Sequence, residues 1–266
     1  MMIANMPDPW AAGQPYEHFM GRWSRLMAHA FIQWLSPPPA LHWLDLGCGT
    51  GALSETILAH ASPTSVLAID PSEALVAFAQ RRLADPRITF QVGEALNLPV
   101  DPHSIQIAVS GLVLNFIPAP VVALQAMRRA LHPDGMIALY VWDYAGKMEM
   151  LRYFWDNAVA LDPGARVLDE GVRFPVCQPD ALSQVCAEAG LHHIDVSGIE
   201  VSMTFVDFAD YWSPFLGGQG PAPGYMAGLG VTSRTALEER LRTTLPFRED
   251  GSLNLVARAW AVRARP

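Results

Sequence analysis

The sequence predicts an α/β protein with a doubly wound, mostly parallel sheet, and two observations carry this prediction. The first is a buried strand ending at Leu46, which leads through three alternating glycines into a helix that starts near Ala52. Such a strand, glycine turn and helix form the first crossover of a nucleotide-binding sheet. The second is that the predicted strands end at polar residues, namely Asp45, Asp70, Glu94, Ser110 and Asp143. Because ligands of open α/β sheets bind beyond the carboxyl ends of the strands, these residues mark one candidate site.

The composition limits the size, the location and the binding partners that we expect for the chain. Its 266 residues are 51% hydrophobic, which is enough for one large domain or for a domain with a lid. The formal net charge of −8 argues against a nucleic-acid partner, because binding phosphate backbones requires clustered Lys and Arg. No apolar stretch approaches the ~18 residues of a membrane span, and the N-terminus lacks a signal-peptide pattern. The odd number of cysteines, three, suggests free thiols in a reducing compartment, so we expect a cytoplasmic protein. The cysteines form no CxxC or Cys/His cluster, so we expect no metal.

The loop after the first strand, Asp45 to Gly51, has glycine at alternate positions. Glycines lack a Cβ atom and let the backbone approach a ligand closely. The loop alone leaves the nucleotide open, because Gly47, Gly49 and Ala52 also fit a loose dinucleotide-binding pattern. The carboxylate of Asp45 favours a ligand that carries an ammonium or sulfonium group, since it would repel a pyrophosphate.

The motif Asp45-x-Gly47-x-Gly49-x-Gly51 resembles the first motif of class I S-adenosylmethionine (SAM)-dependent methyltransferases. The resemblance covers most of residues 41–135, and the overall pattern is similar to the small-molecule branch that includes ubiquinone and menaquinone methyltransferases. It implies a Rossmann-like, seven-stranded sheet with an antiparallel last strand. It also implies SAM as cofactor, S-adenosylhomocysteine as product, and in-line transfer of the methyl group to a small molecule.

The N-terminal segment is expected to cover the cofactor. Apolar residues recur at helical spacing from Tyr16 to Leu35, and the prolines at 37–39 end this helix. In the family that the chain resembles, such helices lie over the cofactor, which would place Tyr16 and Trp23 in the site. The alternative is a helix that only packs on the core.

The ends of the second, third and fourth strands, at Asp70, Glu94 and Ser110, supply the rest of the expected cofactor site. The strand at 65–69 ends at Asp70, which is placed to accept both ribose hydroxyls or to cap the next helix. After the strand at 88–92, the resemblance places Glu94 and Ala95 against adenine, although an ordinary polar loop would look the same. The full predicted cofactor-binding set is Tyr16, Trp23, Asp45, Gly47, Cys48, Gly49, Gly51, Asp70, Pro71, Ser72, Glu94, Ala95 and Ser110. The alternative for Cys48 is a small space-filling residue.

The fourth strand, at 105–109, and the fifth, at 136–142, bring the catalytic candidates to the methyl-donor side. Asn115 follows the fourth strand as an amide in an apolar run, and it either bonds local backbone or faces the site. Asp143 and Tyr144 follow the fifth strand. Asp143 is a candidate base, or it anchors the segment that follows. Between these strands we expect a helix over 121–131 and a turn at 132–135.

The remainder of the chain is expected to form a lid and the last strands of the sheet. One or two helices are predicted over 147–177, a core helix over 178–189, an edge strand over 199–205, a helix over 232–245 and a strand over 253–262. A second lid segment spans 206–226, with the glycine-rich loop 217–224 as a hinge. The acceptor pocket would be formed by Asn115, Tyr144, Trp155, Tyr211, Trp212 and Phe215. Packing in a core is the alternative for these aromatic residues.

The predicted organisation is therefore an N-terminal arm and covering helix (1–40), a SAM-binding core (41–146), a helical lid (147–177) and a C-terminal part of the core (178–266). A nucleic-acid methyltransferase is disfavoured because Ser110-Gly111-Leu112-Val113 stands where an Asp/Asn-Pro-Pro-Tyr/Phe motif would be expected. The alternatives left open are a SAM-binding protein, a SAM-dependent enzyme without methyl transfer, and an NAD-dependent oxidoreductase.

Overall fold

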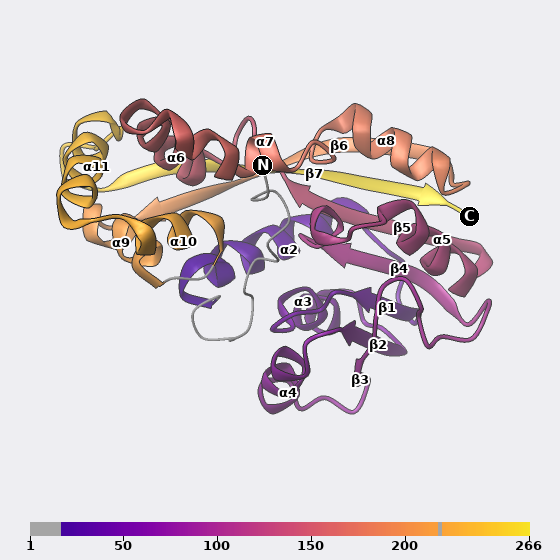
Figure 1. Cartoon of the computed structure of the whole chain (residues 1–266). Coiled ribbons are helices and arrows are strands. Elements are labelled where there is room, and N and C mark those ends of the chain that lie inside the picture. The colour runs from indigo at the N-terminus through magenta and orange to yellow at the C-terminus, as the bar shows by residue number, and fades with distance from the viewer. Residues whose placement is uncertain (1–16, 218–219) are drawn as a thin grey trace.

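A seven-stranded sheet with the strand order β3-β2-β1-β4-β5-β7-β6 runs through the molecule (Figure 1). The computed structural model describes residues 17–217 and 220–266, so Tyr16 lies outside the described residues. The strands are β1 (His42–Leu46), β2 (Ser65–Asp70), β3 (Ile88–Val92), β4 (Ile105–Gly111), β5 (Leu131–Trp142), β6 (His192–Phe205) and β7 (Leu253–Arg265). The first five strands pair in parallel, and β7 is antiparallel to both β5 and β6. The predicted fold class is confirmed.

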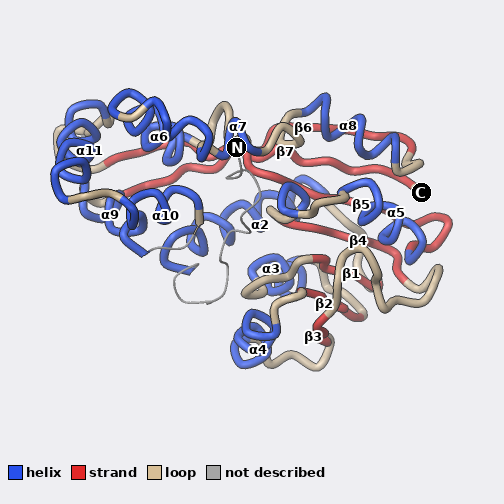
Figure 2. The backbone as a smooth tube through the Cα atoms, in the orientation of Figure 1, coloured by secondary structure: helices blue, strands red, loops and turns tan. Residues whose placement is uncertain are grey.

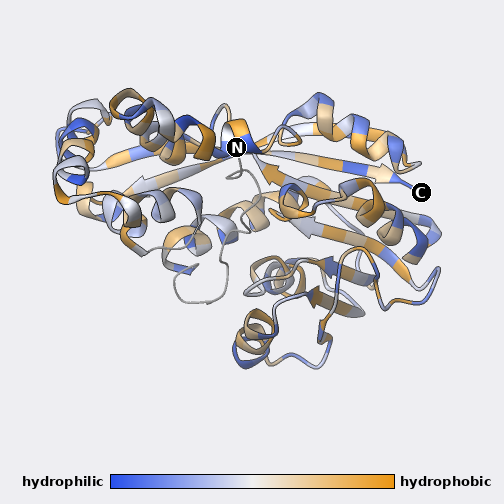
Figure 3. Cartoon of the chain, viewed as in Figure 1, coloured by the Kyte–Doolittle hydropathy of each residue, from blue (hydrophilic) through white to orange (hydrophobic). Residues whose placement is uncertain are grey.

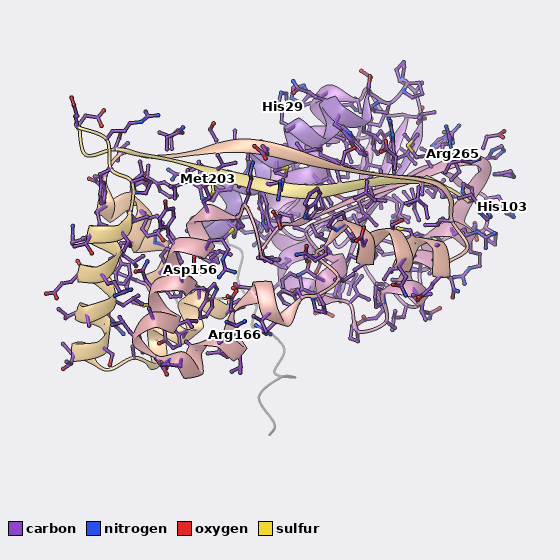
Figure 4. The ribbon with its side chains drawn as sticks, turned by 90° about the horizontal axis from the view of Figure 1, so that it is seen from above. His29, His103, Asp156, Arg166, Met203 and Arg265 are labelled. Carbon is purple, nitrogen blue, oxygen red and sulfur yellow. The ribbon has the colours of Figure 1, made fainter. Side chains whose placement is uncertain are left out.

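Helices cover both faces of this sheet (Figure 2). The helices α2 (Arg22–Leu35) and α3 (Ala52–His60) pack together, and α4 (Glu73–Arg82) covers β2 and β3. The helices α5 (Pro120–Ala130) and α8 (Pro179–Glu188) form a second packed pair. Viewed from above, His29 of α2 and Asp156 of the lid helix α6 (Glu149–Leu161) lie on opposite sides of the long strands (Figure 4). No helix among the described residues is long and apolar enough to span a membrane.

The covering helix forms because its apolar side chains share one face. One π-helical turn (Glu17–Gly21) leads into α2, which buries Trp23, Met27 and Phe31 among its apolar residues. The helix ends at Ser36, which has a φ of 44° just before the three prolines. The predicted helix is thus present from residue 17 onward.

The segment predicted as a turn at 132–135 lies inside β5. Leu131 pairs with Ile105, the register then shifts, and regular pairing resumes with Ile107 opposite Met136. Residues 132–135 are therefore an irregularity within a longer strand. The rest of β5 is almost entirely buried, as expected for a central strand covered on both faces (Figure 3).

The two last strands extend beyond the rest of the sheet. β5 pairs with β7 only between Ala259 and Ala264. The first half of β7 continues past the end of β5 and pairs with β6, which is an edge strand as predicted. Glu149 occupies part of the exposed edge of β7 by accepting a hydrogen bond from Val256 N at 2.7 Å.

The helices of the two predicted lid segments lie along this extension (Figure 1). They are α6, α9 (Phe208–Trp212) and α10 (Pro221–Gly228), and α11 (Val231–Thr244) packs against α6. Between α6 and α8 lie a 3₁₀ segment (Pro163–Leu168) and the short helix α7 (Glu170–Arg173). The predicted hinge loop 217–224 differs from the structure, because Pro221 begins helix α10 with the backbone φ that a first helical position requires. Residues 218–219 of that loop lie outside the described residues.

Candidate functional site

A cavity of about 270 Å³ opens where the central strands end. Its walls come from the glycine loop after β1, the end of β2, the loop after β4 and the end of β5, with Met20 and Ser24 from the N-terminal helical segment. The volume lies near the lower end of the range for ligand pockets, which starts at roughly 300 Å³. The predicted cofactor residues that line it are Asp45, Gly47, Cys48, Gly49, Asp70, Pro71 and Ser72. Strand ends that are far apart in the sequence therefore meet at one cavity, and Asp45 and Asp70 are the predicted strand-end residues that line it.

The three glycines of the loop all have positive φ but serve different purposes. A Cβ atom on Gly47 would lie 2.6 Å from both γ-carbons of Val113, and one on Gly51 would lie 2.8 Å from Leu83 Cδ1. A Cβ atom on Gly49 would meet no described atom within 4 Å. Gly47 and Gly51 therefore permit close packing of the loop, whereas Gly49 leaves open space on the cavity side.

Asp45 is a buried carboxylic acid at the end of the central strand, with a relative exposure of 1%. Its Oδ2 accepts a hydrogen bond from Ser54 Oγ at 2.6 Å, while its buried Oδ1 has no partner among the described residues. Burial raises the pKa of Asp45 to about 7, and the charge of Asp70 adds to this rise. The unpaired oxygen makes Asp45 a ready acceptor for a cationic group in the cavity.

Asp70 connects β2 to the glycine loop. Its Oδ2 accepts from Gly49 N at 2.9 Å, and its Oδ1 accepts from Ser72 N at 2.9 Å. Ser72 is the N-cap of α4, with its hydroxyl accepting from Leu75 N at 3.3 Å. Burial raises the pKa of Asp70, with a smaller contribution from the nearby charge of Glu94. Each oxygen of Asp70 retains a lone pair, so the backbone contacts leave room for the predicted ribose contact.

Several predicted cofactor residues do not line the cavity. Trp23 packs against Phe205 with ring centroids 5.0 Å apart, and Ser110 donates its hydroxyl to Leu46 O at 2.9 Å. Glu94 is exposed and Ala95 half-buried, both beyond the end of β3. The residues of the predicted set that are described but absent from the lining are Trp23, Gly51, Glu94, Ala95 and Ser110.

Asp143 is held in a buried ion pair. Its Oδ2 accepts from Arg258 at 2.9 Å (Nε) and 2.7 Å (Nη2), and also from Lys147 N at 2.8 Å. Its Oδ1 accepts from Gly146 N at 3.1 Å. The side chain does not line the cavity. This geometry favours the anchoring role over the role of a base, because it fixes the start of the lid to β7.

Of the other two catalytic candidates, Tyr144 lines the cavity and Asn115 does not. Asn115 is next to the lining residue Phe116, and its amide nitrogen and oxygen are both buried without a partner among the described residues. Of the expected acceptor-pocket residues, Tyr144 is the one that reaches the main cavity.

The predicted aromatic residues of the lid pack with one another. Phe215 stacks on Phe154 at a centroid distance of 4.5 Å, and Tyr211 donates its hydroxyl to Met150 O at 2.9 Å. Trp212 stacks on Phe208 at 5.8 Å, and Trp155 is fully buried. Trp155, Tyr211, Trp212 and Phe215 therefore form the core of the lid rather than the wall of the cavity, which was the alternative left open by their spacing.

Three features of the site have no clear sequence signal. Leu112 lines the cavity with a φ of 63°, a conformation that apolar residues rarely adopt. Glu17 accepts a hydrogen bond from Thr50 Oγ1 at 2.6 Å, which joins the covering helix to the glycine loop. Glu170 is a buried carboxyl in the lid. No group of three metal-ligating side chains occurs among residues 17–217 and 220–266.

The sequence around the cavity is similar to those of known methyltransferases. Residues 44–139 match a family model described as a methyltransferase domain. The malonyl-[acyl-carrier protein] O-methyltransferase of Methylococcus capsulatus is 32% identical over 127 residues, which make up 47% of this chain and 46% of that protein. The demethylmenaquinone methyltransferase of Chlamydia felis is 30% identical over 98 residues, 37% of this chain and 43% of that protein. The chain thus spans less than half the length of these curated relatives.

The solved structures agree on the fold. Haemonchus contortus phosphoethanolamine N-methyltransferase 2, in complex with S-adenosyl-L-methionine, superposes with a TM-score of 0.57 and 15% identity. The alignment covers 94% of this chain and 56% of that chain. Residues 44–139 therefore match a methyltransferase domain, as the resemblance of the glycine motif predicts, and the solved structure shares the fold of this chain.

The two loop glycines that differ in packing provide a matched test. Gly47→Ala should lower the unfolding free energy more than Gly49→Ala, because both share the left-handed backbone cost of about 1–2 kcal/mol but only Gly47 meets Val113. Chemical denaturation of both variants measures the difference. Equal losses would show that Gly49 is also a packing glycine.

The Asp143–Arg258 pair predicts a loss of stability when Asp143 is removed. Asp143→Ala should lower the unfolding free energy by about 2–3 kcal/mol, somewhat less than for a fully buried pair because Arg258 is partly exposed. Glu200→Ala, which removes an exposed carboxylate 3.9 Å from the same arginine, is the control and should cost less than about 1 kcal/mol. A stable Asp143→Ala variant would contradict the anchoring role.

Proposed function

We propose that this chain, which carries a methyltransferase domain over residues 44–139, is a SAM-dependent enzyme that methylates a small, apolar or aromatic molecule. The single observation that carries the proposal is the unpaired Oδ1 of Asp45, buried at the wall of the cavity. A buried carboxyl with a free lone pair at this place suits the ammonium group of the methionine part of SAM.

The residues around the cavity fit this cofactor in chemistry. Asp45 would bind the ammonium group and Asp70 the ribose hydroxyls, while the open space beside Gly49 would receive the ligand next to the backbone. Glu94 and Ala95 remain the predicted neighbours of adenine. SAM supplies an electrophilic methyl group when it is bound, so the protein has to hold, orient and dry the reacting groups.

The apolar and aromatic lining of the cavity favours the acceptor class. Leu112, Phe116, Tyr140, Trp142 and Tyr144 line the same cavity as Asp45 and Asp70. Side chains of this kind bind the body of an apolar or aromatic molecule and exclude water. Correct alignment of the nucleophile with the methyl group can contribute several kcal/mol to catalysis without a dedicated base.

The raised pKa of Asp45 predicts a pH dependence of SAM binding. Below pH 7 the carboxyl of the free protein is mostly protonated, and it must lose its proton to pair with an ammonium group. The affinity for SAM should therefore rise about tenfold between pH 5.5 and pH 7, and fall again above pH ~8 as the α-amino group of the ligand loses its charge. Isothermal titration calorimetry measures this profile.

Asp45→Asn is the matched variant for this profile. An amide of the same size does not titrate, so the affinity of the variant should be lower at pH 7 and nearly flat between pH 5.5 and pH 7. A wild-type affinity that does not change with pH, or the same profile in the variant, would remove Asp45 from the ammonium site.

A further inference from the structure

A second, smaller cavity adjoins the main one. Its volume is about 20 Å³, which is room for one water-sized group. Met20, Phe116 and Tyr144 line both cavities, so the two share a wall. The small cavity lies between the N-terminal segment, the strand-end loops and the lid, and the one ionisable carboxyl among its described lining residues belongs to Glu170.

The lid holds Glu170 in this place through several contacts. Asp169 forms a two-point ion pair with Arg152, at 3.0 Å and 2.6 Å, and Arg152 also donates to Tyr144 O at 3.0 Å. Phe174 packs on the rings of Phe116 and Tyr144, at centroid distances of 5.1 Å and 5.7 Å. The short helix α7 is thereby fixed against the wall that the cavities share.

The carboxyl of Glu170 is buried, with a relative exposure of 3%. It accepts a hydrogen bond from Trp155 Nε1. Burial raises the pKa of Glu170 to about 8; the charge of Asp169 adds to the rise, and the Trp155 bond and the charge of Arg173 oppose it. Arg152 forms its two-point ion pair with the neighbouring Asp169 rather than with Glu170.

We propose that Glu170 recognises the acceptor by accepting a hydrogen bond from a hydroxyl or ammonium group at the end of a small apolar or aromatic body. The small cavity holds a head group of that size, and the aromatic wall shared with the main cavity holds the body. This assignment rests on the proposed function and names the acceptor class of the same site. It makes Glu170 a specificity-determining residue that the sequence pattern does not single out.

Three probes of similar size test the assignment: phenol, benzylamine and toluene. They are titrated into protein saturated with S-adenosylhomocysteine and labelled with ¹⁵N at tryptophan. The Nε1–H signal of Trp155, identified by its loss in Trp155→Phe, reports on the carboxyl that it touches. We expect phenol or benzylamine to shift this signal and to bind at least fivefold more tightly than toluene.

Two variants separate the two kinds of head group. In Glu170→Leu, phenol and benzylamine should bind no more tightly than toluene. A buried leucine of similar volume is compatible with folding. Glu170→Gln should preserve the advantage of phenol, since an amide oxygen still accepts a hydrogen bond, but should abolish that of benzylamine. Glu239→Gln, on the exposed face of α11, is the control and should change nothing.

The assignment is overturned if toluene binds as tightly as both polar probes, or if Glu170→Leu retains the advantage of the polar probe. Calorimetric titration with S-adenosylhomocysteine alone tests the proposed function independently of this result. If that ligand does not bind, the probe titrations of the free protein still decide the role of Glu170.

Discussion

The burial of Asp45 at the carboxyl end of the central strand is the constraint on which the site depends. Strand β1 lies between β2 and β4, so its end is enclosed by neighbours on both sides. A carboxyl in this position loses most of its hydration, and Ser54 compensates only one of its oxygens. The other oxygen is available to a cationic ligand, whose charge would stabilise the carboxylate in place of the lost hydration. The glycine loop, with Asp70 bonded to Gly49 N, provides access to that oxygen.

The lid depends on the same sheet through its last two strands. Because β6 and β7 continue beyond β5, they provide a surface against which α6 and α9 pack (Figure 1). The pair between Asp143 and Arg258 joins the end of β5 to this extension, and the ion pair of Arg152 fixes α7 beside Tyr144. In this way the sheet whose strand ends form the cavity also positions α7 and Tyr144 beside it.

The fold and the glycine loop at the cavity could be predicted because their signals are local. Alternating or continuous apolar runs mark the strands, and the spacing of Gly47, Gly49 and Gly51 marks the loop within a few residues. The sequence leaves two roles open for Asp143, a base or an anchor, because its partner Arg258 lies 115 positions further along the chain. The aromatic residues of the lid are predicted to form the acceptor pocket, with packing in a core as the alternative, because their spacing does not state what they pack against. Glu170 follows Asp169 in a pair that looks like a solvated loop, and only the tertiary structure buries it.

The proposed binding of SAM through Asp45 and Asp70, in the cavity at the strand ends, can be observed in a crystal structure of the protein with S-adenosylhomocysteine. We expect the amino group of the ligand within about 3.2 Å of Asp45 Oδ1 and both ribose hydroxyls at the carboxylate of Asp70. A ligand bound elsewhere, or bound here with its amino group directed away from Asp45, would show that Asp45 does not hold the cofactor.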